Sequence, residues 1–80
     1  MAEKQVVINN SLDARQAAFF VQTASKYDCR IQVMIDNKKI NAKSIMGTIA
    51  LGMIEGKLAV ITAEGSDAEQ AVNELAGVLA

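Results

Sequence analysis

The amino-acid sequence predicts an α+β fold, an open-faced sandwich in which three helices cover one face of a four-stranded antiparallel sheet. Strand-like and helix-like segments follow one another in the order strand, helix, strand, strand, helix, strand, helix. Only the Asp36-Asn37 turn separates the second and third strands, so these two are expected to form a hairpin. A chain of 80 residues has room for one small domain, residues 1–80.

The four strands are predicted from the spacing of apolar residues. Apolar and polar residues alternate over residues 5–8 and 31–35, and a short strand returns over residues 39–42. The fourth segment, residues 58–63, is apolar on both of its faces, which is typical of a strand in the middle of a sheet. We therefore expect the fourth strand to fill the gap beside the first.

The three helices are predicted from helical spacing and from capping residues. The first begins at Asp13 and carries a buried stripe of Ala14, Ala17, Ala18, Val21 and Ala24. The second begins at Ser44 and runs to about Met53, with Gly52 at its end. The third follows a predicted capping box at residues 66–69 and buries Ala68, Ala71, Val72, Leu75, Ala76 and Leu79.

The composition excludes several classes of function. The formal net charge is −1 and the charges are interspersed, which argues against direct binding of nucleic acid. No apolar stretch approaches the ~20 residues of a membrane span, so we expect no membrane insertion. Cys29 is the only cysteine, which suits a reducing compartment, and no signal peptide precedes the first strand. These features predict a cytoplasmic protein.

The chain contains no histidine, which removes the usual general base near neutral pH and the usual imidazole ligand of metals. With one cysteine and no histidine, the sequence predicts no zinc or transition-metal site. It also contains no glycine-rich phosphate loop and no pair of residues arranged for nucleophilic catalysis. We therefore expect no cofactor.

Asp13 has a structural and a functional interpretation. Asp is a favoured N-cap residue, and Gln16 three residues later completes a variant of the capping box. The functional interpretation is an anion site at the start of this helix, with Arg15 supplying a positive charge. The carboxylate of Asp13 would compete with an anion bound there.

The start of the second helix also has two interpretations. Ser44 is a natural N-cap, which is the interpretation that the residues alone favour, and it is also a candidate phosphorylation site, because a phosphate is tolerated at a helix N-terminus. Ile45, Met46 and Ile49, together with Met53, cannot all point inward from so short a helix. They are either core residues or an exposed patch on which a partner docks, and both interpretations stay open.

Two stretches, FVQTASKYDCRIQV at residues 20–33 and NAKSIMGTIALG at residues 41–52, resemble the HPr family, the phosphocarriers of the bacterial sugar phosphotransferase system. The resemblance extends over nearly the whole chain and implies the open-faced sandwich. In that family a histidine in a Gly-x-His-Ala-Arg-Pro-Ala loop carries phosphate from enzyme I to enzyme IIA. In some members a kinase/phosphorylase also modifies a serine in Lys-Ser-Ile-Met-Gly, and the modified form binds the catabolite-control repressor.

The serine motif of this family is intact in the chain, whereas the histidine loop is not. Ser44, Ile45, Met46 and Gly47 match the serine motif, so the resemblance implies regulatory phosphorylation of Ser44. It also implies that Arg15, Ile45, Met46 and Ile49 bind partners. In the histidine loop, matches remain at Ala14, Arg15 and Ala17, but Ser11 replaces Gly, Asp13 replaces the phosphorylated His, and Gln16 replaces Pro.

The resemblance therefore implies a regulatory binding module without catalytic activity, similar to the Crh-like members that lack the active histidine. Its expected partners are the HPr kinase/phosphorylase and the catabolite-control repressor. An alternative stays open, in which the protein is a phosphocarrier that accepts phosphate from enzyme I on Asp13 and passes it to enzyme IIA. In a third interpretation, Asp13 only imitates the charge of the phosphorylated state and occupies those partners without turnover.

Overall fold

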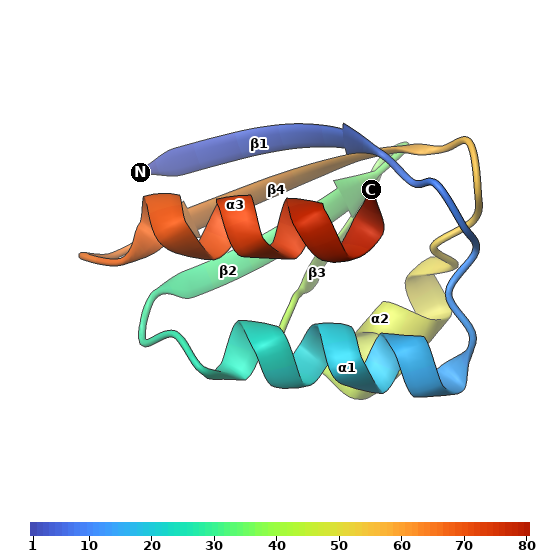
Figure 1. The fold of residues 1–80 in the computed structure, drawn as a ribbon, viewed down its shortest axis with the longest axis horizontal. Coiled ribbons are helices and arrows are strands. Elements are labelled where there is room, and N and C mark those ends of the chain that lie inside the picture. Colours follow the sequence, from blue (N-terminus) through green and yellow to red (C-terminus); the bar gives the residue numbers. More distant parts are fainter.

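A computed structural model describes all residues, 1–80, and contains the predicted elements in the predicted order (Figure 1). The strands are β1 (Ala2–Val7), β2 (Arg30–Ile35), β3 (Lys38–Asn41) and β4 (Leu58–Glu64). The helices are α1 (Ala14–Ser25), α2 (Ile45–Leu51) and α3 (Ala68–Leu79). None of the helices has the length and apolar character that a membrane crossing requires.

The four strands form one antiparallel sheet in the order β1-β4-β2-β3, which confirms that the fourth strand lies beside the first. Because β4 is central, both of its edges are paired, with β1 on one side and β2 on the other. Its alternate residues Ala59, Ile61 and Ala63 are at most 1% exposed and face the helices. The first strand begins earlier than predicted, at Ala2, and Ile8 is buried just beyond its end.

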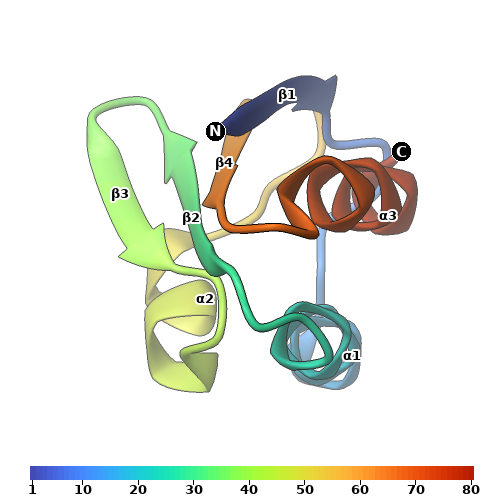
Figure 2. The same cartoon turned by 90° about the vertical axis from the view of Figure 1, so that its left-hand side faces the viewer.

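All three helices lie on one face of the sheet, as Figure 2 shows, so the predicted open-faced sandwich is confirmed. α3 packs on β1, β4 and β2, α2 packs on β3, and α1 contacts both other helices. The core between these layers is mainly aliphatic, and its aromatic members are Phe20 and Tyr27.

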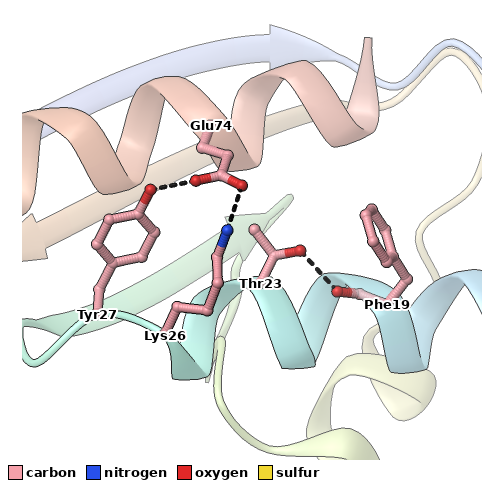
Figure 3. Close-up of polar contacts among 5 residues, drawn as sticks. All are labelled: Phe19, Thr23, Lys26, Tyr27 and Glu74. Atoms are coloured by element: carbon pink, nitrogen blue, oxygen red, sulfur yellow. Dashed lines mark hydrogen bonds and ion pairs between the residues drawn. The ribbon is translucent and has the colours of Figure 1, made fainter.

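The stripe predicted for α1 is only partly correct. Ala17 and Ala24 are buried, Ala18 and Val21 are half-buried, and Ala14 is exposed because it lies at the free end of the helix. The largest buried side chain of the helix is Phe20, which has no exposed surface. Thr23 is also buried, and its hydroxyl donates a hydrogen bond to the Phe19 carbonyl at 2.8 Å (Figure 3). A polar residue can face the core here because the helix backbone satisfies it.

The capping box predicted at residues 66–69 is wrong. Asp67 is the N-cap of α3, but its side chain makes no capping hydrogen bond. Its Oδ2 instead accepts a long hydrogen bond of 3.4 Å from the Asp28 N–H, in the connection between α1 and β2. The neighbouring Cys29 thiol lowers the pKa of Asp67, which favours the charged carboxylate in that position. α2 also ends earlier than predicted, at Leu51, because Gly52 adopts a left-handed conformation with φ 71°.

Gly65 permits a close approach between the turn before α3 and the connection before β2. Its φ is 145°, and a Cβ on this residue would lie 2.6 Å from the Cβ of Cys29. No side chain fits in that space, so glycine is required on two independent grounds. Cys29 is held beneath this contact with 3% of its surface exposed, and burial raises the pKa of its thiol.

A small polar network connects the end of α1 to the middle of α3 (Figure 3). The Lys26 ammonium and the Tyr27 hydroxyl both donate to the Glu74 carboxylate, the former at 2.7 Å. Lys26 first and Tyr27 second lower the pKa of Glu74, and the same hydrogen bond from Tyr27 raises the pKa of that phenol to about 12. The network therefore favours an ionised Glu74 beside a neutral Tyr27.

We expect the Glu74→Gln variant to show a weaker loss of stability in acid than the parent chain. Because the folded-state pKa of Glu74 is lowered, its contribution is present above the ordinary carboxyl pKa of 4.5 and is lost as pH falls through the lower folded value. The free energies of unfolding of the two proteins should thus differ most near pH 7 and converge below about pH 4. Urea unfolding followed by circular dichroism between pH 3 and 7 measures both.

Glu55→Gln is the control for this experiment, because it removes an exposed carboxylate whose side chain accepts no hydrogen bond. If Glu55→Gln reduced the loss of stability in acid as much as Glu74→Gln does, that loss could not be assigned to the network of Glu74 with Lys26 and Tyr27.

Candidate functional site

The start of α1 is closed by the capping box that the sequence predicts. The Asp13 carboxylate oxygen Oδ1 accepts a hydrogen bond of 2.9 Å from the Gln16 N–H. In return, the Gln16 Oε1 accepts one of 3.2 Å from the Asp13 N–H. Both residues are exposed, so this reciprocal pair lies at the surface of the molecule. Asp13 therefore performs a structural task, which its charge reinforces at the positive end of the helix.

Arg15 is the free cation beside this cap. It lies in the first turn of α1, is exposed, and forms no ion pair and no side-chain hydrogen bond. An unpaired guanidinium has its full set of donors available for a phosphate or a carboxylate of another molecule.

The loop before Asp13 is held against the segment that follows α2. The Leu12 N–H donates to the Met53 carbonyl at 3.0 Å, and the Glu55 N–H donates to the Ser11 hydroxyl at 2.9 Å. The start of α1 is thus held to the C-terminal end of α2, whereas Ser44 lies at the opposite end of that helix. No hydrogen bond connects Arg15 and Ser44.

Ser44 is the N-cap of α2, as the sequence predicts. Its Oγ accepts a hydrogen bond of 3.1 Å from the Gly47 N–H, and the residue is half-buried. Gly47 leaves room around this hydroxyl, since a Cβ on it would lie 3.2 Å from the Ser44 Oγ. The adjacent Lys43 does not face Ser44, because its ammonium donates to the Tyr27 carbonyl at 2.5 Å.

The apolar residues of α2 and of the segment that follows it divide between surface and core. Met46 is 76% exposed, Ile49 52% and Ile45 38%, whereas Met53 is only 4% exposed and belongs to the core. The structure adds two exposed apolar residues that sequence reasoning missed, Phe19 on α1 and Ile54 after α2. Neither Phe19 nor the buried Phe20 belongs to the stripe predicted for α1, so the sequence did not indicate which of the two faces the core.

A shallow cavity of about 250 Å³ lies beside the capped start of α1. Its lining is mainly apolar and consists of Asn10, Leu12, Gln16, Phe19, Val78, Leu79 and Ala80. The chain has no group of three or more His, Cys, Asp or Glu side chains that could hold a metal ion. The surface around α1 and α2 therefore has the character of a docking face, with one free guanidinium and a set of exposed apolar side chains.

A family model described as "PTS HPr component phosphorylation site" matches residues 2–80. The chain belongs to the HPr family. Among curated relatives, the HPr-like protein Crh of Halalkalibacterium halodurans is 42% identical over 77 residues, which are 94% of this chain and 92% of that protein.

Solved structures agree with this assignment. HPr-C-His of Thermoanaerobacter tengcongensis is 48% identical, with a TM-score of 0.93, over 99% of this chain and 91% of that one. Crh of Bacillus subtilis, described as a domain-swapped dimer, is 35% identical, with a TM-score of 0.79, over 99% and 91% of the two chains. Proteins of the HPr family are phosphocarriers or regulators, and their partners belong to the phosphotransferase system.

We expect Asp13→Ala to lower the free energy of unfolding by about 1 kcal/mol, because the Gln16 N–H loses its acceptor. Asp13→Ser should retain most of that stability, since serine caps helices almost as well. Thermal and urea unfolding measure the difference. Equal stability of Asp13→Ala and the parent chain would contradict a capping role for this carboxylate.

Proposed function

We propose that this chain is a regulatory, Crh-like member of the HPr family that is phosphorylated on Ser44 and acts in carbon catabolite control. The observation that carries the proposal is the combination of an intact serine motif at the start of α2 with Asp13 in the position of the family's histidine. We further propose that residues 1–80 form a single HPr-like domain and that the protein works in the cytoplasm.

The geometry at Ser44 supports its use as a phosphate acceptor. The hydroxyl only accepts in its capping bond with Gly47, so its proton and one face of the oxygen remain available. Transfer from ATP forms the bond between the Ser44 oxygen and the γ-phosphorus, breaks the bond to the β-phosphate, and releases the hydroxyl proton to a base of the kinase. The added charge of about −1.5 to −2 then lies beside Ile45, Met46 and Ile49.

The exposed residues of α2 and the start of α1 support the recognition of partners. A partner that binds the phosphorylated form meets the phosphate and the apolar side chains of α2, and Arg15 offers a second charged contact. Methionine suits such a contact because its side chain adapts to different partner surfaces. The HPr kinase/phosphorylase and the catabolite-control repressor are the partners that fit this arrangement.

The alternative, a phosphocarrier that uses Asp13, has less support. Asp13 Oδ1 accepts the Gln16 N–H, so a phosphoryl group on this carboxylate would have to be carried by Oδ2 or replace that capping bond. Such a carrier would take phosphate from enzyme I and pass it to enzyme IIA as an acyl phosphate. The hydrogen bonds of Asp13 favour a cap over a nucleophile at this position.

Incubation with an HPr kinase/phosphorylase and ATP should place phosphate on Ser44 and on no other residue. We expect Ser44→Ala to abolish incorporation, and Ser11→Ala to retain it, because Ser11 is an exposed serine outside the motif. Mass spectrometry of the intact and digested chain locates the phosphate.

A parallel reaction with phosphoenolpyruvate and enzyme I tests Asp13. We expect it to give no hydroxylamine-sensitive phosphate. If such a phosphate appeared, and Asp13→Ala abolished it, the result would favour the alternative.

The phosphorylated chain should bind the catabolite-control repressor through α2. We expect Met46→Ser to weaken this affinity about tenfold, because it removes the most exposed apolar contact of the helix. Its stability should change little, since the side chain is 76% exposed. Met34→Ser is a matched control on the far side of the sheet, and calorimetry should show no change in its affinity. Equal affinity of Met46→Ser and the parent chain would contradict docking on α2.

A further inference from the structure

Lys43, the residue before Ser44, holds the start of α2 to the connection between α1 and β2. Its ammonium donates a hydrogen bond of 2.5 Å to the Tyr27 carbonyl, and the residue is half-buried. The ammonium forms no ion pair, so the acceptor that holds it is a neutral backbone oxygen. The proposed function gives this lysine no role, although the next residue in the chain is the proposed phosphate acceptor.

The connection that receives this bond, residues 26–29, is otherwise hydrogen-bonded only to α1 and to α3 with its N-cap. The side chains of its first two residues both donate to the Glu74 carboxylate of α3 (Figure 3). The bond from Lys43 is the only hydrogen bond that joins the connection to residues 43–51. The attachment of the connection to the start of α2 through hydrogen bonds therefore depends on one ammonium.

A phosphate on Ser44 would bring a competing acceptor next to this ammonium. It carries a charge of about −1.5 to −2 and three acceptor oxygens, and it attracts an ammonium more strongly than the dipole of a backbone carbonyl does. The Cα atoms of adjacent residues are about 3.8 Å apart, and the lysine side chain is a flexible four-carbon stem. The Lys43 ammonium can therefore turn from the Tyr27 carbonyl to a phosphate on the next residue.

We propose that Lys43 is a charge switch that transmits the state of Ser44 to the connection between α1 and β2. In the unmodified chain its ammonium holds the Tyr27 carbonyl. When Ser44 carries phosphate, the ammonium pairs with the phosphate and releases that carbonyl. The connection keeps its bonds to Glu74 but loses its bond to Lys43, so it opens more often. The switch rests on the proposed phosphorylation of Ser44, and it makes the two forms of the protein differ at the end of α1 as well as on α2.

The test compares two chains made by chemical synthesis, with serine or phosphoserine at position 44. The ¹³C signal of the Tyr27 carbonyl reports its hydrogen bond, and hydrogen exchange of the Tyr27 and Asp28 amides, both hydrogen-bonded, reports opening of the connection. We expect phosphoserine to shift the carbonyl signal and to speed exchange about tenfold, as the loss of one hydrogen bond to a charged group implies. Because no kinase is used, failure of the switch and failure of Ser44 phosphorylation are separate results.

Two lysine variants assign the effect. Lys43→Met keeps an unbranched side chain but removes the donor, so its serine form should already exchange fast and phosphoserine should change neither signal. Lys39→Met is the matched control, because Lys39 is exposed on β3 and forms no ion pair, and it should respond as the parent sequence does. The switch is overturned if phosphoserine leaves the Tyr27 carbonyl signal or the exchange rates of the parent sequence unchanged, or if Lys43→Met responds like the parent. The parent comparison decides even if a variant fails to fold.

Discussion

The pairing of β4 with both β1 and β2 is the constraint on which the rest of this structure depends. In the sheet, β1 is not paired with the β2–β3 hairpin, and β4 lies between them. Without β4, no strand pairing would connect β1 to the β2–β3 hairpin. The contacts involved lie far apart in the sequence, so the fold is cooperative at the cost of loop-closure entropy.

The same pairing positions the functional face. The segment that leads into β4 runs beside the segment that leaves β1, and the Ile8 N–H donates to the Lys57 carbonyl at 2.9 Å while the Gly56 N–H donates to the Ile8 carbonyl at 2.8 Å. From this base, Leu12 is bonded to Met53, and the start of α1 is fixed next to the end of α2. The exposed residues of two helices are thereby brought near each other, although no hydrogen bond joins the two helix starts.

The starts of α1 and α2 could be predicted from the sequence because each has a local cause, and the central place of β4 could be predicted because its residues are apolar on both faces. Asp13 with Gln16 and Ser44 before Gly47 are capping signals that need no tertiary information, and both form as expected. The cap at residues 66–69 failed for the opposite reason, since the Asp67 carboxylate turns toward Asp28, a residue distant in sequence. The exposure of Phe19 and the retention of Lys43 by the Tyr27 carbonyl likewise depend on packing that no periodicity encodes.

Because Gly65 packs tightly on Cys29, the reactivity of the Cys29 thiol can be used to measure local opening of this contact. Cys29 is the only thiol, it is 3% exposed, and burial raises its pKa, so alkylating reagents find neither an accessible nor an ionised sulfur in the native state. Modification requires that the turn before α3 lift away from the start of β2, which separates the last helix from the connection below it. The rate of labelling would then report these openings, and the unaltered chain carries the thiol where the turn before α3 meets the start of β2.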